Sequence, residues 1–157
     1  MGNAMLKKKL VHLVVGAVLS AAVSVPAMAM DKNYKRGSVW SVTLVKVDPG
    51  KGDDYLDSLK DAFMRVNDEA VKEKVILSYK ILVGDSSNST DWNVMIMTEA
   101  ANFGALDTME AKMDAIAAKA YGTMEKADAT DKEAMTNRAK IRTIFGDKMM
   151  QEIHFVK

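Results

Sequence analysis

The chain has 157 residues, a formal net charge of +1 and no cysteine. This length is sufficient for one domain with a hydrophobic core. The near-neutral charge, spread along the chain, argues against a nucleic-acid partner, which requires a basic surface. The absence of cysteine excludes disulfide bonds, thiol catalysis and a lipoprotein acylation site.

The first 29 residues show the three zones of a secretory signal peptide. Three lysines at positions 7–9 precede an apolar stretch over residues 10–25, and the small residues Ala27 and Ala29 occupy the −3 and −1 positions of a cleavage site. The apolar stretch is shorter than the roughly 20 residues that a membrane-spanning helix needs. We therefore expect cleavage before Met30, export to the periplasm, and no stable membrane anchor after cleavage.

The expected mature chain differs in charge from the full sequence. Cleavage removes three lysines and no acidic residue, which lowers the formal net charge from +1 to −2. Residues 30–37 are polar and are predicted to form a flexible N-terminal arm, and residues 38–157 are predicted to form a single domain. Because an exported domain without disulfides depends on packing, oligomerisation would add to its stability.

The first half of this domain contains three predicted strands and one helix. Residues 38–47 are rich in β-branched and aromatic side chains and end at an Asp-Pro-Gly turn, which predicts a strand. Over residues 53–74 apolar side chains recur every three or four positions, which predicts a helix. Residues 75–83 and 92–99 are predicted strands, and the polar segment between them is a hairpin loop.

The second half completes the predicted order of elements. A second helix runs from the N-cap residue Asn102 to Gly122. Thr130 and Glu133 fit the capping-box pattern, which places the start of a short third helix at Thr130. Residues 149–156 form the last strand. The order β-α-β-β-α-(α)-β predicts a ferredoxin-like fold of the α+β class, with a four-stranded antiparallel sheet and helices on one face.

Strand residues alternate between the two faces of a sheet, so the parity of each position sorts them. We assign the more apolar set to the face beneath the helices: Trp40, Val42, Leu44, Leu77, Tyr79, Ile81, Trp92, Val94, Ile96, Met149, Ile153 and Phe155. The other face mixes apolar and short polar side chains: Ser41, Thr43, Val45, Ile76, Ser78, Lys80, Leu82, Asn93, Met95, Met97, Met150, Glu152, His154 and Val156. Monomers rarely expose so much apolar surface. We therefore expect a second copy to cover this second face, as a two-fold homodimer.

The element order, the Val-Asp-Pro-Gly-Lys junction at residues 47–51 and the half-polar sheet face resemble the dimeric α/β-barrel superfamily, in particular its small exported bacterial members of unassigned function. The resemblance covers residues 38–157. It implies that two sheets pair face to face into a barrel. It also implies a range of activities, because the superfamily includes cofactor-independent monooxygenases, haem-degrading monooxygenases, chlorite dismutases and lactone isomerases.

The haem-degrading activity of that superfamily is not expected for this chain. It requires an asparagine on the first strand, a tryptophan near the second helix and a histidine on that helix. The first strand has Ser41 and Thr43 instead, the second helix starts at Phe103, and no histidine lies between Met30 and Ile153.

The predicted ligand cavity lies between the two paired sheets. Its lining is Ser41, Thr43, Ser78, Lys80, Asn93, Met95, Met97 and Met150. Glu152 and His154 are two apart on one strand and so share a face, where they are the candidate acid–base catalytic residues. The alternative is that His154 is an interface residue without a catalytic role. A lone histidine without a second ligand does not indicate a metal site, so we expect no metal and no cofactor.

Two arginines allow two interpretations. Arg138 and Arg142 lie four apart on the predicted third helix and share one of its faces. They would bind an anionic ligand or, as we prefer, belong to a solvated helix face. Trp40, Trp92 and Tyr79 are interpreted as core residues.

Three functions remain open from the sequence. The first is a periplasmic homodimer that binds a small, mostly apolar molecule in the inter-sheet cavity. The second is a cofactor-independent monooxygenase or isomerase that uses the same cavity. The third is a non-catalytic envelope or stress-related interaction protein, for which the sequence has no positive feature.

Overall fold

The computed structural model describes residues 33–156, so the predicted signal peptide, with Ala27 and Ala29, lies outside the described residues. The chain contains four strands and two helical segments. The first helical segment, residues 52–72, follows the first strand, and the second helical segment, residues 103–139, follows the third. The elements are β1 (Tyr34–Val47), α1 (Gly52–Ser58), the π-helix η1 (Leu59–Met64), α2 (Arg65–Lys72), β2 (Ser78–Val83), β3 (Val94–Ala100), α3 (Phe103–Leu106), α4 (Met109–Tyr121), α5 (Met124–Ala139) and β4 (Arg142–Phe155).

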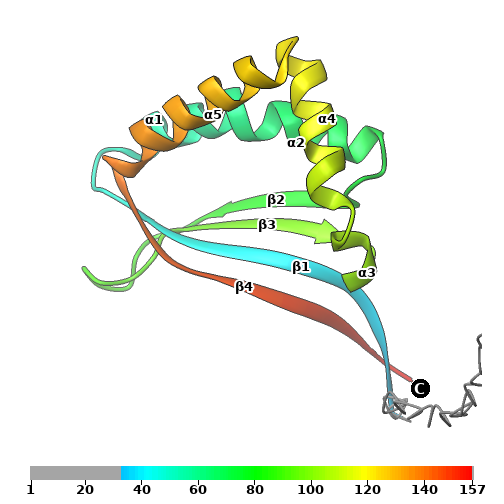
Figure 1. Cartoon of the computed structure of the whole chain (residues 1–157). Helices are drawn as coiled ribbons and strands as arrows, with labels where there is room; N and C mark the ends of the chain where they lie inside the picture. Colours follow the sequence, from blue (N-terminus) through cyan, green and yellow to red (C-terminus); the bar gives the residue numbers. More distant parts are fainter. Residues whose placement is uncertain (1–32, 157) are drawn as a thin grey trace, which may run out of the picture. The chain divides into compact units, whose positions relative to one another are not determined.

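The four strands form one sheet in the order β2-β3-β1-β4, and every neighbouring pair is antiparallel. Each helical segment therefore connects two strands that are separated by a third, which is the split β-α-β arrangement of ferredoxin-like folds. All the helices lie over one side of the sheet (Figure 1). The predicted α+β, ferredoxin-like fold is confirmed.

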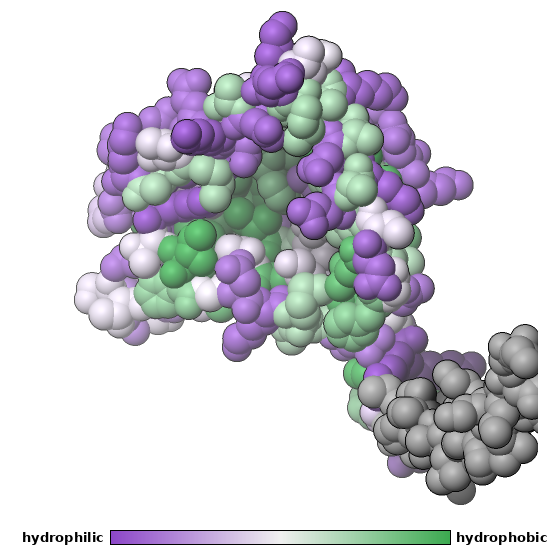
Figure 2. All heavy atoms as spheres, viewed as in Figure 1, coloured by the Kyte–Doolittle hydropathy of each residue, from purple (hydrophilic) through white to green (hydrophobic). Residues whose placement is uncertain are grey.

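The hydrophobic core lies between the helices and the sheet. One buried cluster joins β1 and β3 to the first helical segment through Val45, Val47, Tyr55, Leu59 and Val94. A second cluster contains Ala70, Ile76 and Ile116. Figure 2 shows the same separation, with hydrophobic side chains gathered in the hollow between helices and sheet and hydrophilic ones over the outer helix surface. Burial of these apolar groups on one side of the sheet holds the two layers together.

The first helical segment matches the predicted helix, but its middle turn is wider than an α-helix. The six residues of η1 are π-helical, a geometry that leaves backbone groups without their usual partners. Asn67, which is buried, compensates within the helix, since its Nδ2 donates a hydrogen bond of 2.7 Å to the carbonyl oxygen of Phe63.

In the second helical segment, α5 begins earlier than the third helix that the sequence predicted. The Asn102 N-cap is confirmed, because its Oδ1 accepts a hydrogen bond of 2.9 Å from the Ala105 N–H. The capping box at Thr130 is wrong. α5 begins seven residues earlier, where the side chain of Thr123 accepts from the Lys126 N–H, and Thr130 is an interior residue whose hydroxyl donates to the Lys126 carbonyl.

The first and last strands of the chain, β1 and β4, are longer than the sequence indicated. β1 begins at Tyr34, so the last part of the predicted flexible arm, Tyr34 to Gly37, belongs to the sheet and pairs with the end of β4. β4 begins at Arg142 rather than at residue 149. Two register shifts interrupt the pairing of β1 with β4, one between Arg36 and Val39 and one between Leu44 and Val45. Such irregularities re-aim side chains locally.

The two faces of β1 are the reverse of the prediction. Val45 and Val47 are buried against Tyr55 and Leu59 of the first helical segment, so they lie on the helix side. Trp40, Val42 and Leu44 pair with Glu99, Met97 and Met95 and lie on the opposite side with them. The size of these three side chains favoured burial beneath helices, but the position of α1 over the end of β1 decides the orientation.

No helix in the described part of the chain has the length and apolar character that crossing a membrane requires.

Candidate functional site

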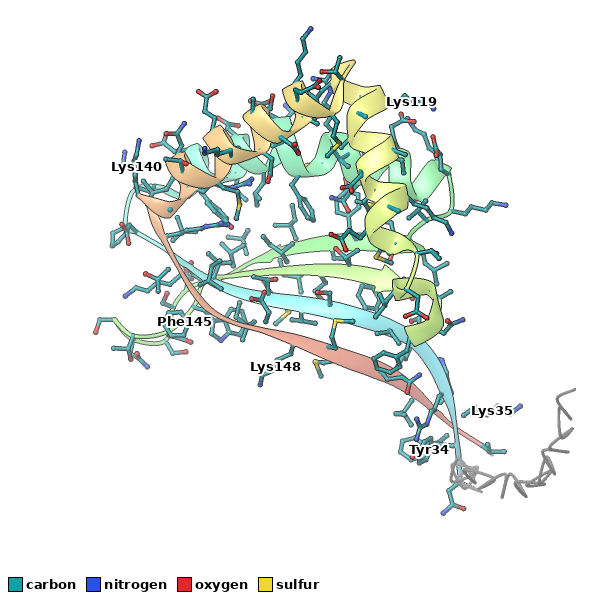
Figure 3. All side chains as sticks on the ribbon, viewed as in Figure 1. Tyr34, Lys35, Lys119, Lys140, Phe145 and Lys148 are labelled. Carbon is teal, nitrogen blue, oxygen red and sulfur yellow. The ribbon has the colours of Figure 1, made fainter. Side chains whose placement is uncertain are left out.

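The side of the sheet that carries no helix is the candidate site, and we call it the open face. The strand register, continued by alternation along β4 as far as Glu152, assigns twelve side chains to it: Trp40, Val42, Leu44, Ser78, Lys80, Leu82, Met95, Met97, Glu99, Lys148, Met150 and Glu152. Figure 3 shows Lys148 and Phe145 on this side of the sheet, while Lys119 and Lys140 extend from the helix layer. The open face is therefore continuous across all four strands.

The centre of the open face is apolar. Leu44, Met95, Met97 and Val42 occupy the two inner strands, with Leu82 on the β2 edge and Met150 on the β4 edge. Leu82 is 51% exposed and Met150 is 55% exposed. An apolar surface of this kind, surrounded by polar side chains, is typical of an interaction or ligand-binding site.

Polar side chains meet at one end of the open face. The Ser78 hydroxyl donates a hydrogen bond of 2.5 Å to the Glu99 carboxylate. The Ser38 and Ser78 hydroxyls beside its carboxylate, together with the positive charge of Lys80, hold the pKa of Glu99 below its usual range. The Lys80 ammonium in turn lies 4.9 Å from the ring centroid of Trp40, a cation–π geometry. This end of the face therefore carries a fixed negative charge next to a fixed positive one.

The predicted catalytic pair lies beyond this end, along β4. The Nε2 atom of His154 is 3.5 Å from Oε2 of Glu152, which also accepts a hydrogen bond of 3.2 Å from the Ser38 hydroxyl. Gly37 allows this arrangement, because a Cβ atom there would lie 2.5 Å from Nε2 of His154. The structure thus brings Glu152 and His154 together, with both side chains about half exposed in the single chain.

Five of the eight predicted cavity residues lie on the open face: Ser78, Lys80, Met95, Met97 and Met150. Ser41 and Thr43 do not, because the faces of β1 are reversed. Both lie on the helix side, where the Thr43 hydroxyl donates a 2.5 Å hydrogen bond to Asp147.

Asn93 is the third predicted cavity residue that the structure places elsewhere. It immediately precedes β3, and its side-chain amide exchanges two hydrogen bonds with the backbone of Val47. Its polar atoms extend the pairing of β3 with β1 and are not directed to a ligand.

The sequence interpretation missed five residues of the open face: Lys148, which lies before the predicted start of the last strand, and Trp40, Val42, Leu44 and Glu99. The signal for Glu99 was present, since it has the same parity as Met95 and Met97. The three residues of β1 follow once β1 is paired with β3, because residues opposite one another in an antiparallel pair share a face.

The preferred interpretation of Arg138 as a solvated residue is wrong. Arg138 is only 4% exposed and lies beneath α5, where its guanidinium faces the first helical segment. Arg142 belongs to β4 and not to the helix, and its Nη1 donates a hydrogen bond of 3.1 Å to the Tyr55 hydroxyl.

Within residues 33–156, no three histidine, cysteine, aspartate or glutamate side chains gather closely enough to hold a metal ion.

The fold and the open face define the chain as a ferredoxin-like α+β protein with an uncovered sheet face. It matches no protein-family model and no curated protein. Among the solved structures, it is similar to a protein from Caulobacter crescentus CB15 described as an antibiotic biosynthesis monooxygenase. The sequence identity is 18%, the TM-score is 0.37, and the match covers 79% of this chain and 93% of the other. This degree of likeness carries no conclusion about activity.

Proposed function

We propose that the protein is an exported homodimer of the dimeric α/β-barrel type, whose two open faces pack together and bind a small, mostly apolar molecule between them. The observation that carries the proposal is the apolar centre of the open face, with Leu82 and Met150 each more than half exposed in the single chain. A second copy removes this surface from water, which is the main favourable term in protein association.

The charges around the apolar centre support self-association. Lys80 and Lys148 lie beside it, while Glu99 and Glu152 lie toward one end. Two-fold symmetry brings the same patch of both copies together. Such a packing allows the lysines of one copy to approach the carboxylates of its partner, and this complementarity sets the register of the two sheets.

The corrected lining also defines the ligand more closely. Three short polar side chains leave the predicted lining, and Trp40 and Leu44 replace them, while Val42 between these two is only 5% exposed. The centre therefore suits an apolar body, and the polar end, with Lys80 and Glu99, suits one polar group on the ligand. Pockets with mostly apolar walls and a few placed polar groups are the usual form of small-molecule sites.

Native mass spectrometry of the protein purified from the periplasm tests this proposal. We expect the mass of a dimer with an additional small molecule, and the additional mass should disappear on denaturation. A ligand-free protein that also binds no member of a broad metabolite panel would count against the ligand site.

A second candidate function, a cofactor-independent monooxygenase or isomerase, is favoured by the contact between Glu152 and His154. The 3.5 Å separation lets the carboxylate orient the imidazole, which is the arrangement of a general acid–base pair. If this candidate is correct, His154→Ala abolishes turnover of the bound molecule, whereas Lys112→Ala on α4 does not. Unchanged turnover in His154→Ala would remove the candidate.

A further inference from the structure

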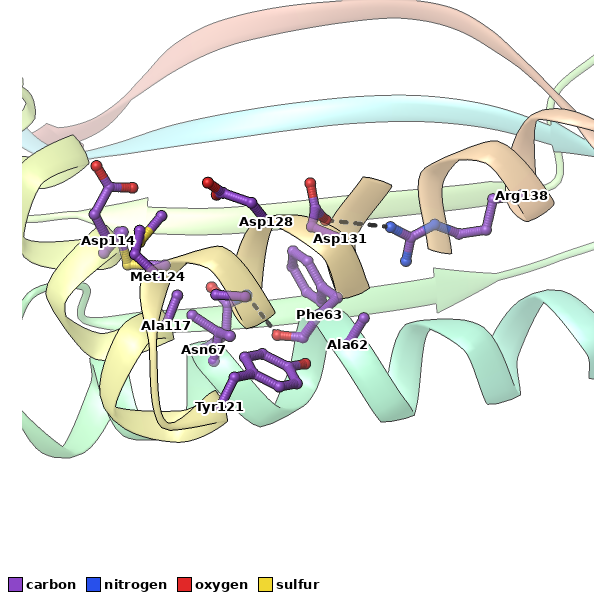
Figure 4. A pocket seen from close by; sticks show the side chains of 13 residues that line it. Ala62, Phe63, Asn67, Asp114, Ala117, Tyr121, Met124, Asp128, Asp131 and Arg138 are labelled. Atoms are coloured by element: carbon purple, nitrogen blue, oxygen red, sulfur yellow. Dashed lines mark hydrogen bonds and ion pairs between the residues drawn. The ribbon is translucent and has the colours of Figure 1, made fainter. Parts of the chain in front are cut away.

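A second site lies among the helices, away from the open face. Residues of η1, α2, α4 and α5 surround a cavity of about 340 Å³ (Figure 4). Most of its wall is apolar, with the rings of Phe63 and Tyr121 and the side chains of Val66, Met113 and Met124. A volume of this size is in the range of small-molecule sites.

One end of this cavity holds a buried cation that lacks a close acceptor. The Arg138 side chain is 5% exposed, and its Nε has no hydrogen-bond partner among the described residues. Its Nη1 reaches the Ser58 carbonyl at 3.5 Å and its Nη2 reaches the Met135 sulfur at 3.2 Å, which is a weak acceptor. Burial, followed by the positive charge of Arg142, lowers the pKa of Arg138. The terminal nitrogens of Arg138 thus have only a long and a weak acceptor, and a carboxylate in the cavity would supply a stronger one.

The Asp131 carboxylate lies beside the Arg138 guanidinium but forms no hydrogen bond with it. Oδ1 of Asp131 lies 3.9 Å from Nη2 of Arg138, too far for a hydrogen bond, and the Asp131 side chain is 73% exposed. Figure 4 shows the Arg138 guanidinium pointing toward Asp131 and the Phe63 ring. One positive and one negative group therefore stand side by side at the end of an apolar cavity.

We infer that this cavity binds a free amino acid with a large apolar side chain. The α-carboxylate pairs with the terminal nitrogens of Arg138, and the α-ammonium pairs with Asp131. The two charges of an amino acid are attached to the same carbon atom, so two adjacent protein groups of opposite charge can bind both. The side chain of the ligand then fills the apolar space beside Phe63 and Tyr121.

The other acidic residues of the cavity favour a zwitterion over a simple anion. Asp114 and Asp128 line the same cavity and are exposed. Their negative charge repels a ligand with net negative charge, whereas a zwitterion brings its own positive charge. This site uses residues of the helix layer only, so the inference is independent of the homodimer and its ligand.

Isothermal titration of the purified protein with phenylalanine tests the inference. We expect phenylalanine to bind, and its analogues 3-phenylpropionate, which lacks the ammonium, and phenethylamine, which lacks the carboxylate, to bind at least tenfold more weakly. Alanine should also bind at least tenfold more weakly, because it leaves the apolar space unfilled. Absence of phenylalanine binding, or equal binding of any of these analogues, would overturn the inference.

Variants identify the site. Arg138→Met and Asp131→Asn should each weaken phenylalanine binding at least tenfold, whereas Lys140→Met, at the exposed end of α5, should not change it. Arg138→Met should remain folded, because it removes a buried charge without a close partner. Asp131→Asn alters an exposed residue and provides the test independently of folding. Wild-type affinity in both variants would show that phenylalanine binds elsewhere.

Discussion

The side-chain amide of Asn93 makes two hydrogen bonds with the backbone of Val47: Oδ1 accepts from the Val47 N–H at 2.8 Å, and Nδ2 donates to the Val47 carbonyl at 3.1 Å. The backbone N–H of Asn93 also donates to the Val45 carbonyl at 3.0 Å. The side chain thus acts as an additional step of the β1–β3 ladder at a position where Val47 is buried.

Replacement of Asn93 should therefore reduce stability without changing ligand binding on the open face. Asn93→Ala leaves two polar groups of Val47 without these partners, and we expect a loss of about 2 kcal/mol in the free energy of unfolding. Urea denaturation measures it. The control Asn137→Ala, on the exposed surface of α5, should change stability by less than about 0.5 kcal/mol. Equal stability of Asn93→Ala and the parent would contradict this role.

The start of α5 provides a second prediction. The Thr123 hydroxyl oxygen accepts from the Lys126 N–H at 3.2 Å, so Thr123→Ala should cost about 1 kcal/mol through loss of the N-cap. Thr130 lies inside the helix, and Thr130→Ala should have a smaller effect because alanine is the better helix former. Thermal unfolding of both variants compares them. A larger loss of stability in Thr130→Ala than in Thr123→Ala would instead support an N-cap at Thr130.

The phenol of Tyr79 should titrate abnormally. Burial, and then the hydrogen bond of 2.6 Å to Asp68, raise its pKa to about 12. The folded protein retains this proton to higher pH than the unfolded chain, whose value is 10.0. The resulting stabilisation is complete below pH 10 and is lost as the pH rises toward 12. Ultraviolet titration should show a late-titrating phenol that Tyr79→Phe removes. Titration of every tyrosine near pH 10 would rule this out.

The sequence predicts the order of elements well because periodicity and turn residues are local signals. It predicts the faces correctly within Ser78–Val83 and Val94–Ala100, where side chains alternate regularly. Ile76, which the sequence assigned to the open face, precedes β2 and is instead buried with Ala70 and Ile116 beneath the helices. β1 carries apolar residues on both parities, so its orientation depends on contacts of Val45 and Val47 with a helix that follows it in the chain.

The positions of the site residues that the sequence misplaced also depend on contacts with residues far away in the chain. The role of Asn93 requires the backbone of Val47, 46 residues away. The burial of Arg138 requires the first helical segment, whose Ser58 carbonyl lies 80 residues away in sequence. Periodicity within one helix or strand contains no information about such pairs.

Substitutions on the two faces of β3 should have different effects: one should disrupt the dimer and the other the fold of each chain. Met97→Asp places a charge in the centre of the open face and should yield folded monomer or aggregate, because the carboxylate loses its hydration in the interface without a partner. Val94→Asp places the charge in the core, where Val94 is 3% exposed, and should damage the fold itself. Lys112→Asp, on the exposed surface of α4, should leave the dimer intact. Size-exclusion chromatography with circular dichroism separates these results, and a folded dimer of Met97→Asp would contradict the interface.

Sedimentation equilibrium of the unaltered exported protein at micromolar concentration tests the open-face interface most directly. The apolar centre, with Leu82 and Met150 more than half exposed in one chain, predicts the mass of a dimer. The mass of a single chain at that concentration would contradict the proposed assembly and the inter-sheet ligand site with it.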